Sequence, residues 1–282
     1  MKSFVPFSLN LQGELHCFTR PCVMGILNVT PDSFYSSSRT FTSDAISQRA
    51  ETLVKEGADI IDIGGYSSRP GADDVNVDEE LRRVEAGIEA VRRISPNIPV
   101  SIDTFRARVA ELAITGMGAN IINDISGGLL DNDMLDVAVK TRAPYIMMHM
   151  RGTPATMQLH TSYNNVTAEV IQWFSKRIAE FSLAGVNDII VDPGIGFSKS
   201  VEGNFELIEN LSMFKILERP VLVGVSRKSM IYKTLETDPE RSLNGTTILN
   251  TLALEWGASI LRVHDVKEAR EVVKLLGLID KV

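Results

Sequence analysis

The sequence is poor in cysteine, since only Cys17 and Cys22 occur among its 282 residues. They stand five positions apart, and no further cysteine or histidine completes a zinc ligand set at the usual spacing. A disulfide framework and a structural zinc site are therefore excluded. We expect both thiols to be free and the protein to reside in a reducing cytoplasm.

Long apolar runs are also absent. Residues 1–18 carry polar side chains every few positions and lack the apolar core of a signal peptide, and no run approaches the roughly 20 residues that span a bilayer. Positive charge is in deficit, because 29 basic side chains face 36 acidic ones and give a net charge of −7. Nucleic acid and anionic membranes both select basic surfaces, so we expect neither as a partner. Any anionic ligand needs a local cluster of Lys and Arg.

The sequence does contain a repeated alternation of two kinds of segment. Eight short runs rich in apolar or β-branched residues are separated by longer stretches. Most of the runs are apolar at consecutive positions, which is typical of strands covered on both faces. The predicted strands are residues 23–28, 59–63, 99–103, 120–124, 144–149, 188–192, 220–224 and 259–263.

The stretches between these runs predict amphipathic helices. Residues 45–54 place five apolar side chains on one stripe, and residues 249–256 form a second stripe. A glycine precedes four of the predicted strands, at a position where helices commonly stop in a left-handed conformation. These glycines are Gly57, Gly118, Gly185 and Gly257.

Strand and helix thus alternate eight times without a linker or low-complexity segment. Because crossover connections are right-handed and sequence neighbours pair in space, this pattern predicts one domain over residues 1–282, in which residues 21–282 form a (β/α)8 TIM barrel. A doubly wound open sheet is the alternative. Residues 1–20, with Gln12-Gly13 at their centre, predict a β-hairpin that closes the bottom of the barrel.

Polar side chains follow or end nearly all of the predicted strands. In a parallel barrel these ends meet at one rim, which carries the catalytic groups. A helix cap or a solvated loop explains any single one of them equally well, but the whole set indicates a functional site. The set comprises Asn28, Ser67, Ser68, Arg69, Asp103, Asn123, Asp124, His149, Asp192, Ser226, Arg227, Lys228, Arg262 and His264.

The chemistry of this rim predicts a heterocyclic phosphate ester as the substrate. Residues 226–229 supply two cations, hydroxyls and a helix N-terminus to one anion, and Arg262 adds a bidentate donor. Asp103, Asn123 and Asp192 offer acceptors and an amide, which suits a flat ring with several N–H donors. No Ser-His-Asp, Cys-His or HExxH pattern is evident, so a covalent nucleophile is not expected.

Seven motifs run through the predicted barrel. They are MGILNVTPDSF at 24–34, GGYSSRPGA at 64–72, SIDT at 101–104, IINDISGG at 121–128, DPGIGFSK at 192–199, VSRKSMI at 225–231 and LRVHDV at 261–266. In this order they closely resemble the dihydropteroate synthase family. NVTPDSF, DPGxGF and SRKS are highly specific together, whereas any one of them alone is a weak signal.

The resemblance implies a homodimeric barrel that joins 6-hydroxymethyl-7,8-dihydropterin pyrophosphate to p-aminobenzoate, with Mg2+ as the cofactor. It implies that Asp103, Lys228 and Arg262 are the catalytic residues. By motif, the pterin ring would contact Asp103, Asn123, Met148, Asp192, Phe197 and Lys228; the pyrophosphate Arg69, Arg262 and His264; p-aminobenzoate Ser68 and Ser229; and the metal Asn28. Departure of pyrophosphate would leave a cation delocalised into the ring, which a neutral arylamine then attacks.

Two segments depart from the family pattern. Residues 35–38 read Tyr-Ser-Ser-Ser where the family usually has Ser-Asp-Gly-Gly, and Tyr66 replaces a usual Glu. We expect these changes to alter the p-aminobenzoate pocket rather than the pterin site. Two alternative functions are a pterin-binding methyltransferase, which has no need of the basic loops, and a non-catalytic pterin-binding paralogue.

Overall fold

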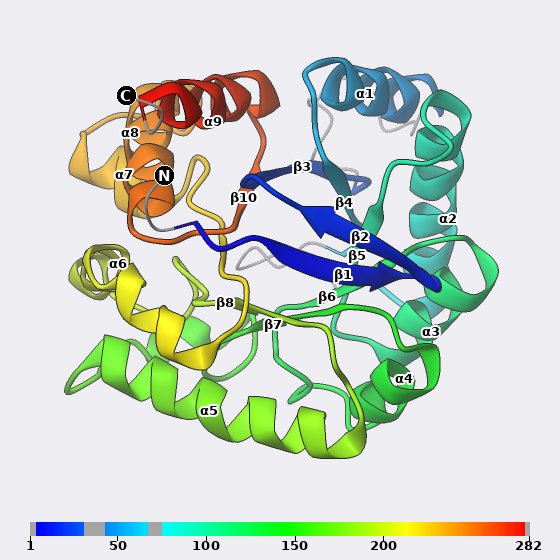
Figure 1. Ribbon diagram of the computed structural model, residues 1–282, viewed down its shortest axis with the longest axis horizontal. Coiled ribbons are helices and arrows are strands. Elements are labelled where there is room, and N and C mark those ends of the chain that lie inside the picture. The colour runs from blue at the N-terminus through cyan, green and yellow to red at the C-terminus, as the bar shows by residue number, and fades with distance from the viewer. Residues whose placement is uncertain (1–3, 31–42, 67–74, 280–282) are drawn as a thin grey trace.

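The computed structural model describes residues 4–30, 43–66 and 75–279, and in these residues eight parallel strands form a nearly closed barrel (Figure 1). The strands follow the order β8-β7-β6-β5-β4-β3-β10-β9, and a parallel bridge between Val191 and Val221 joins the two ends. The predicted (β/α)8 fold is confirmed, and the open sheet is wrong. The strands are β3 (Cys22–Asn28), β4 (Ile60–Gly64), β5 (Val100–Asp103), β6 (Ile121–Asp124), β7 (Tyr145–Met148), β8 (Ile189–Asp192), β9 (Leu222–Val223) and β10 (Ile260–Val263).

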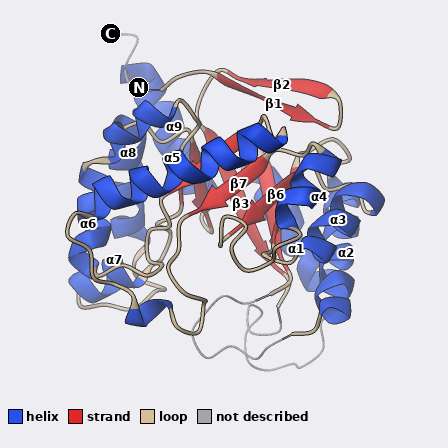
Figure 2. Cartoon of the chain, turned by 90° about the horizontal axis from the view of Figure 1, so that it is seen from below, coloured by secondary structure: helices blue, strands red, loops and turns tan. Residues whose placement is uncertain are grey.

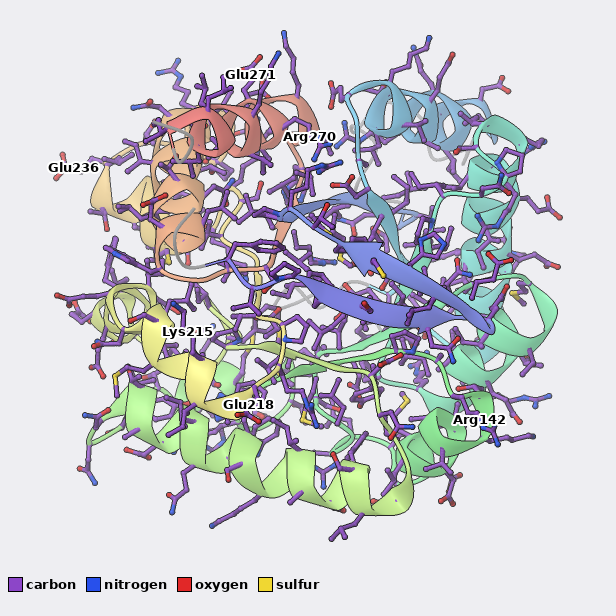
Figure 3. All side chains as sticks on the ribbon, viewed as in Figure 1. Arg142, Lys215, Glu218, Glu236, Arg270 and Glu271 are labelled. Carbon is purple, nitrogen blue, oxygen red and sulfur yellow. The ribbon has the colours of Figure 1, made fainter. Side chains whose placement is uncertain are left out.

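Helices surround the barrel and carry the chain from each strand to the next. They are α1 (Ser43–Lys55), α2 (Val77–Ile94), α3 (Ala107–Gly116), α4 (Met134–Thr141), α5 (Val166–Ala184), α6 (Val201–Glu209), α7 (Ser229–Thr234), α8 (Leu243–Glu255) and α9 (Val266–Ile279), with 3-10 turns η2 (Met157–Leu159) and η3 (Leu211–Leu217). Charged side chains such as Arg142, Glu236 and Glu271 project at the periphery (Figure 3). None of the described helices is both long enough and apolar enough to cross a membrane.

Local signals set the ends of these helices. Asn76 caps α2 by accepting a hydrogen bond from the amide of Glu79 at 2.9 Å, and the acidic residues that follow it favour the positive end of the helix dipole. The four predicted stops are confirmed, because each of these glycines has a left-handed backbone. Their φ angles are 93° at Gly57, 84° at Gly118, 105° at Gly185 and 111° at Gly257.

The barrel interior is divided into an apolar floor and a polar mouth. Successive strand residues point to opposite faces, so every second side chain enters the barrel. Most side chains that enter near the strand starts are buried and apolar, and nearer the strand ends several strands contribute polar side chains, among them Asp62, Asn123 and Arg262. The floor consists of Cys22, Met24, Ile60, Ile121, Ile146, Ile190, Leu222 and Ile260.

An antiparallel hairpin, β1 (Phe7–Leu11) and β2 (Glu14–Phe18), covers this floor (Figure 2). Its turn has φ angles of 54° at Gln12 and 96° at Gly13, which belong to the two-residue turn that suits twisted strands. Leu9 and Leu11 pack into the floor, and the amide of Asn10 donates to Asp188 at 2.7 Å. The prediction that the hairpin closes the bottom of the barrel is confirmed.

We predict that the hairpin contributes to stability without touching the opposite end of the barrel. Leu9 is 1% exposed, so Leu9→Ala should lower the free energy of unfolding by about 2 to 5 kcal/mol through lost burial and a residual cavity. Leu15→Ala is the matched control, because Leu15 lies on the same hairpin and is 70% exposed. Urea denaturation measures both; equal losses would contradict a packed floor.

Candidate active site

Backbone pairing aligns polar residues around the mouth of the barrel. Asn28 pairs with Gly64, Gly64 with Asp103, and Asp103 with Asn123 across β3 to β6. Farther around, Met148 at the end of β7 pairs with Asp192 at the end of β8. The structure therefore brings together residues that the sequence separates by as much as 164 positions, from Asn28 to Asp192.

Arg262 on β10 is the central group of this mouth. Its Nε donates to Oδ2 of Asp62 at 2.6 Å, and its Nη2 donates to Oδ2 of Asp103 at 2.7 Å. Nδ2 of Asn123 donates to the same oxygen of Asp62 at 3.1 Å. Burial opposes the charge of Arg262, yet the two carboxylates raise its pKa above the ordinary value. The guanidinium is therefore a permanent cation held between two strands.

Asp103 titrates far from its usual range. Burial raises its pKa to about 7, Arg262 opposes the rise, and the charges of Asp62, Glu80 and Asp124 add to it. One oxygen of Asp103 accepts from Arg262, and Oδ1 has no hydrogen bond to any described residue. Asp103 can therefore offer a ligand an acceptor whose charge changes close to neutral pH.

Asp192 supports its own loop with one oxygen. Oδ1 accepts from the amide of Gly194 at 2.8 Å, whereas the described residues give Oδ2 no donor. Gly194 has a φ of 69°, and a Cβ there would lie 2.1 Å from the carbonyl oxygen of His149, so only glycine fits. Burial raises the pKa of Asp192, and Lys228 opposes that rise. Asp192 can therefore support the loop that follows it with one oxygen and bind a ligand with the other.

Lys228 lies against the loop that follows Asp192. Its Nζ donates to the carbonyl of Ile195 and sits 4.8 Å from the centroid of Phe197. A Cβ at Gly196 would lie 2.9 Å from Cδ of Lys228, so this approach requires a glycine. Burial lowers the pKa of Lys228 to about 8, with Asp192 opposing the shift. Lys228 is therefore a cation next to the Asp192 carboxylate.

An apolar cluster lies on the same side of the mouth. Met148 is 3% exposed, and Phe197 is half-buried and packs against the cluster. Such flat, soft side chains suit the face of an aromatic ring. The other members are Ile125, Met150 and Met157, with Phe105 and Leu130 packed against them.

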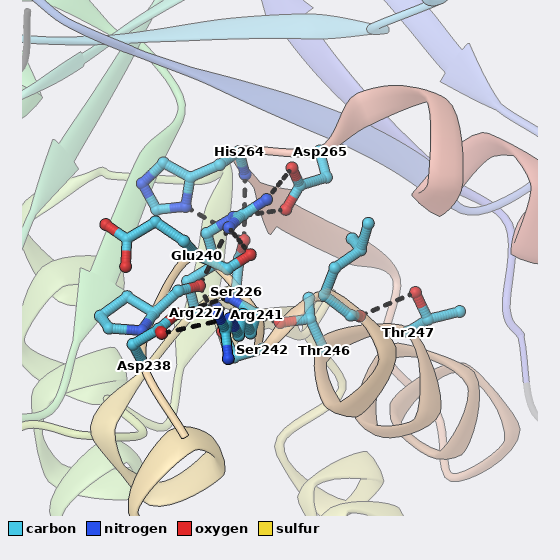
Figure 4. Close-up of polar contacts among 12 residues, drawn as sticks. Ser226, Arg227, Asp238, Glu240, Arg241, Ser242, Thr246, Thr247, His264 and Asp265 are labelled. Carbon is cyan, nitrogen blue, oxygen red and sulfur yellow. Dashed lines mark hydrogen bonds and ion pairs between the residues drawn. The ribbon is translucent and has the colours of Figure 1, made fainter.

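The expectation that Arg227 and Lys228 serve one anion is wrong. Nε and Nη2 of Arg227 donate to the carboxylate of Asp265 at 2.9 and 2.8 Å, and Nη1 donates to the carbonyls of Pro239 and Glu240 (Figure 4). The side chain thus ties the β9–α7 loop to the segments before α8 and α9. A bidentate carboxylate and two carbonyls use its donors, so its function is structural.

His264 and Ser226 form a second pair in this region. Nδ1 of His264 lies 3.0 Å from Oγ of Ser226, which also accepts from the His264 amide at 3.2 Å (Figure 4). Burial, together with Arg262, lowers the pKa of His264 to about 4, so the ring is neutral at pH 7. A hydroxyl proton donated to Nδ1 leaves the ring proton on Nε2, where it can reach an anion.

Two other rim residues do not face the site. Asp124 follows Asn123 and points to the opposite face, where it accepts from the hydroxyl of Tyr145 at 2.5 Å and from the amide of Gly128 at 2.7 Å. His149 is 2% exposed, and its Nδ1 lies 3.1 Å from Nζ of Lys199. Both residues therefore organise loops, because period-two alternation turns them away from the barrel interior.

Only some of the residues predicted to bind the metal and p-aminobenzoate lie in the part of the chain that the structure describes. Ser68, Arg69 and residues 35–38 lie outside the described residues, whereas Ser229 begins α7 and is half-buried beside Lys228. Among the described residues no group of three or more His, Cys, Asp or Glu could hold a metal. Asn28 offers one amide oxygen, and a Cβ at Gly64 would come within 3.2 Å of it. A single oxygen suits Mg2+ when phosphate oxygens and water supply the other ligands.

Sequence reasoning missed Asp62. The pattern of residues 59–63 predicts a strand buried on both faces, and this prediction does not identify Asp62 as a site residue. In the structure the Asp62 carboxylate enters the barrel two positions before the strand end. Asp62 is completely buried, whereas Ile61 and Ile63 on either side belong to the core beneath the helices. The available signal was a charged residue inside a predicted strand, where burial of an unpaired ion is costly.

The titration of Asp103 predicts how ligand affinity depends on pH. If N–H donors of a pterin bind the ionised carboxylate, affinity should rise about tenfold between pH 6 and 8, because Asp103 loses its proton near pH 7. Calorimetry with 6-hydroxymethylpterin measures the effect. Asp103→Asn is the control and reports the titration of the ligand itself; the same pH profile in this variant would contradict the assignment.

The position of Lys228 predicts a loss of affinity without a loss of fold. Lys228→Met removes the half-buried cation and should weaken pterin binding about tenfold or more, in line with charged hydrogen bonds. Lys233→Met is the matched control, since Lys233 is exposed on α7, the helix that Lys228 precedes as its N-cap. Calorimetry and thermal unfolding are measured on both variants. Equal affinity in the two would remove Lys228 from the site.

Comparisons with known proteins agree with this geometry. A model of the pterin binding enzyme family matches residues 24–264. The dihydropteroate synthase of Synechocystis sp. is 45% identical over 259 residues, 91% of this chain and 89% of that protein. The Xanthomonas albilineans dihydropteroate synthase solved with 4-aminobenzoic acid superposes with a TM-score of 0.91 at 37% identity, covering 99% of this chain and 100% of that one. The same enzyme with 7,8-dihydropteroate gives 0.87 at 34%, covering 98% and 100%. This chain therefore belongs to the dihydropteroate synthases of the pterin-binding enzyme family.

Proposed function

We propose that this chain catalyses the dihydropteroate synthase reaction of folate biosynthesis. It joins 6-hydroxymethyl-7,8-dihydropterin pyrophosphate to p-aminobenzoate and releases pyrophosphate. The observation that carries the proposal is the convergence of Asp103, Asn123 and Asp192 with Lys228 and Arg262 at one barrel mouth. Relatives solved with 4-aminobenzoic acid and with 7,8-dihydropteroate support it.

The acceptors would bind the pterin ring along its edge. Oδ1 of Asp103 and Oδ2 of Asp192 lack donors among the described residues, and Asn123 uses its amide nitrogen on Asp62. Three acceptors thus remain for the N–H groups of the ring, which would sit against Met148 and Phe197. An unpaired buried acceptor is costly, so a ring that supplies the missing donors is selected over one that does not.

The basic groups would hold the pyrophosphate. Nε and Nη2 of Arg262 bind carboxylates, and its Nη1 has no partner among the described residues. The neutral ring of His264 can donate from Nε2, and Arg69, outside the described residues, is the third predicted donor. Donors held in advance at the leaving group stabilise the charge that develops there.

The reaction then needs little proton transfer from the protein. The carbon–oxygen bond to pyrophosphate breaks, and its electron pair leaves with the phosphate. The methylene cation is delocalised into the dihydropterin, and the arylamine nitrogen donates its lone pair to form the new carbon–nitrogen bond. The proton of that nitrogen passes to water or to pyrophosphate. Ser229 and Ser68 would bind the p-aminobenzoate carboxylate and so orient the amine.

Mg2+ and a homodimer belong to the same proposal. The amide oxygen of Asn28 would hold Mg2+, which would neutralise the leaving pyrophosphate when bound. Exposed apolar side chains support an interface between two copies on the packed helices α8 and α9. These are Ile248 on α8 and Leu275 and Leu278 on α9.

The purified protein should form dihydropteroate from the pterin pyrophosphate and p-aminobenzoate with Mg2+. Product and pyrophosphate are both quantified, with and without p-aminobenzoate. Asp192→Asn is the control, because it replaces an acceptor pair with a group that offers one acceptor and misplaced donors and should therefore lose pterin binding. Pterin binding without any product would instead identify a non-catalytic paralogue. Methyl transfer from methyltetrahydrofolate would identify the other alternative.

A further inference from the structure

Asp62 is a buried ion that the fold does not require. It lies in the middle of β4 with no exposed surface, at the boundary between the apolar floor and the polar mouth. The neighbouring interior residue of the same strand, Ile60, is apolar, and an apolar side chain in place of a buried ion pair is commonly as stable or more stable. A buried carboxylate at this point therefore needs an explanation in the site above it.

One oxygen of Asp62 controls two residues of the proposed pterin site. Oδ2 accepts from Nε of Arg262 at 2.6 Å and from Nδ2 of Asn123 at 3.1 Å. The second contact decides which end of the Asn123 amide is free, because a nitrogen committed to Asp62 leaves the amide oxygen as the group available to a ring. The first contact, together with Asp103, leaves Nη1 as the free end of Arg262.

The other oxygen of Asp62 receives no hydrogen bond of this kind from the described residues. Oδ1 is buried and has no hydrogen-bond partner in the described structure. With Asp103 ionised, the mouth holds three carboxylates, Asp62, Asp103 and Asp192, and two cations, Lys228 and Arg262, so these five groups carry one negative charge in excess. Charges in a buried site interact more strongly than in water. This excess favours a cationic ring over a neutral one.

We propose that Asp62 is a positioning residue for this reaction, which orients Asn123 and Arg262 and supplies the negative charge that balances the cationic pterin. The inference rests on the proposed function. It assigns two separable tasks to one side chain. Orientation acts on ground-state binding of the ring, whereas the charge acts when the carbon–oxygen bond breaks and the ring becomes positive.

Three variants separate the two tasks. Asp62→Asn keeps an oxygen that can accept from both Arg262 and Asn123 and removes only the charge. Asp62→Ala removes the charge and both contacts. Ser101→Ala is the matched control, because Ser101 is directly paired with Asp62 in register on β5, is equally buried and has an unpartnered hydroxyl.

For Asp62→Asn we expect kcat to fall about tenfold or more, with pterin affinity within about threefold of the parent, because the lost interaction matters mainly in the transition state. For Asp62→Ala we expect both kcat and pterin affinity to fall about tenfold or more, and for Ser101→Ala we expect neither to change beyond about twofold. If Asp62→Asn kept the kcat of the unsubstituted enzyme, the charge role would be overturned. If Asp62→Ala bound the pterin as tightly as the unsubstituted enzyme does, the positioning role would be overturned.

A binding measurement keeps the test independent of turnover. The charged groups that act on Asp103 are Arg262 on β10, Asp62 on β4, Glu80 on α2 and Asp124 on β6, and the Asp62 charge is among those that raise its pKa. Asp62→Asn should therefore shift the pH dependence of pterin affinity to lower pH, whereas a merely structural role would leave it in place. If the parent enzyme made no dihydropteroate, the proposed function would fail. The pterin affinity of Asp62→Ala would still decide the positioning role, and the pH shift in Asp62→Asn would still show whether the Asp62 charge acts on the site. Thermal unfolding verifies that each variant is folded.

Discussion

The interaction on which the site depends is the ion pair of Arg262 with Asp62 and Asp103 across the barrel. A guanidinium has donors in a rigid plane, so two carboxylates on different strands can hold it in one orientation. The two contacts join β10 to β4 and β5, whose residues lie 200 and 159 positions away from Arg262 in the sequence. Other groups of the mouth are linked to this cation. Asn123 shares its partner, and Lys228 and Asp192 lie within the same field.

The charged cluster around Arg262 is stable because the barrel separates an apolar floor from a polar mouth. The apolar floor under the hairpin excludes water and supplies the hydrophobic stabilisation, so the polar layer above it can be arranged for chemistry. Low dielectric surroundings make each charge act strongly on its neighbours, which explains why the pKa values of Asp103 and Lys228 move toward neutrality from opposite sides. The same surroundings make an unbalanced charge costly.

The loops above the strands owe their shapes to interactions that never reach a ligand. Arg227 ties the β9–α7 loop to Asp265, and buried Lys199 donates to the carbonyls of Gly194 and Phe197 in the loop after β8. Each of these cations neutralises backbone or carboxylate groups of its own loop. Lys228 and Arg262 instead lie at the mouth, where both interact with the charges of Asp103 and Asp192.

The sequence by itself determined the barrel. Consecutive apolar runs separated by helical stripes and glycine stops are local signals, and the eight strands form within a few residues of the predicted runs, although β9 is only Leu222–Val223. It also placed the acceptors and cations at one rim. Only the tertiary structure decided which of them face inward, because the period-two register turns Asn123 into the site and Asp124 out of it. Asp62, hidden within an apolar run, and Arg227, committed to Asp265, depend on partners that are distant in sequence. A local pattern carries no information about such pairings, and they are what give each charge its role.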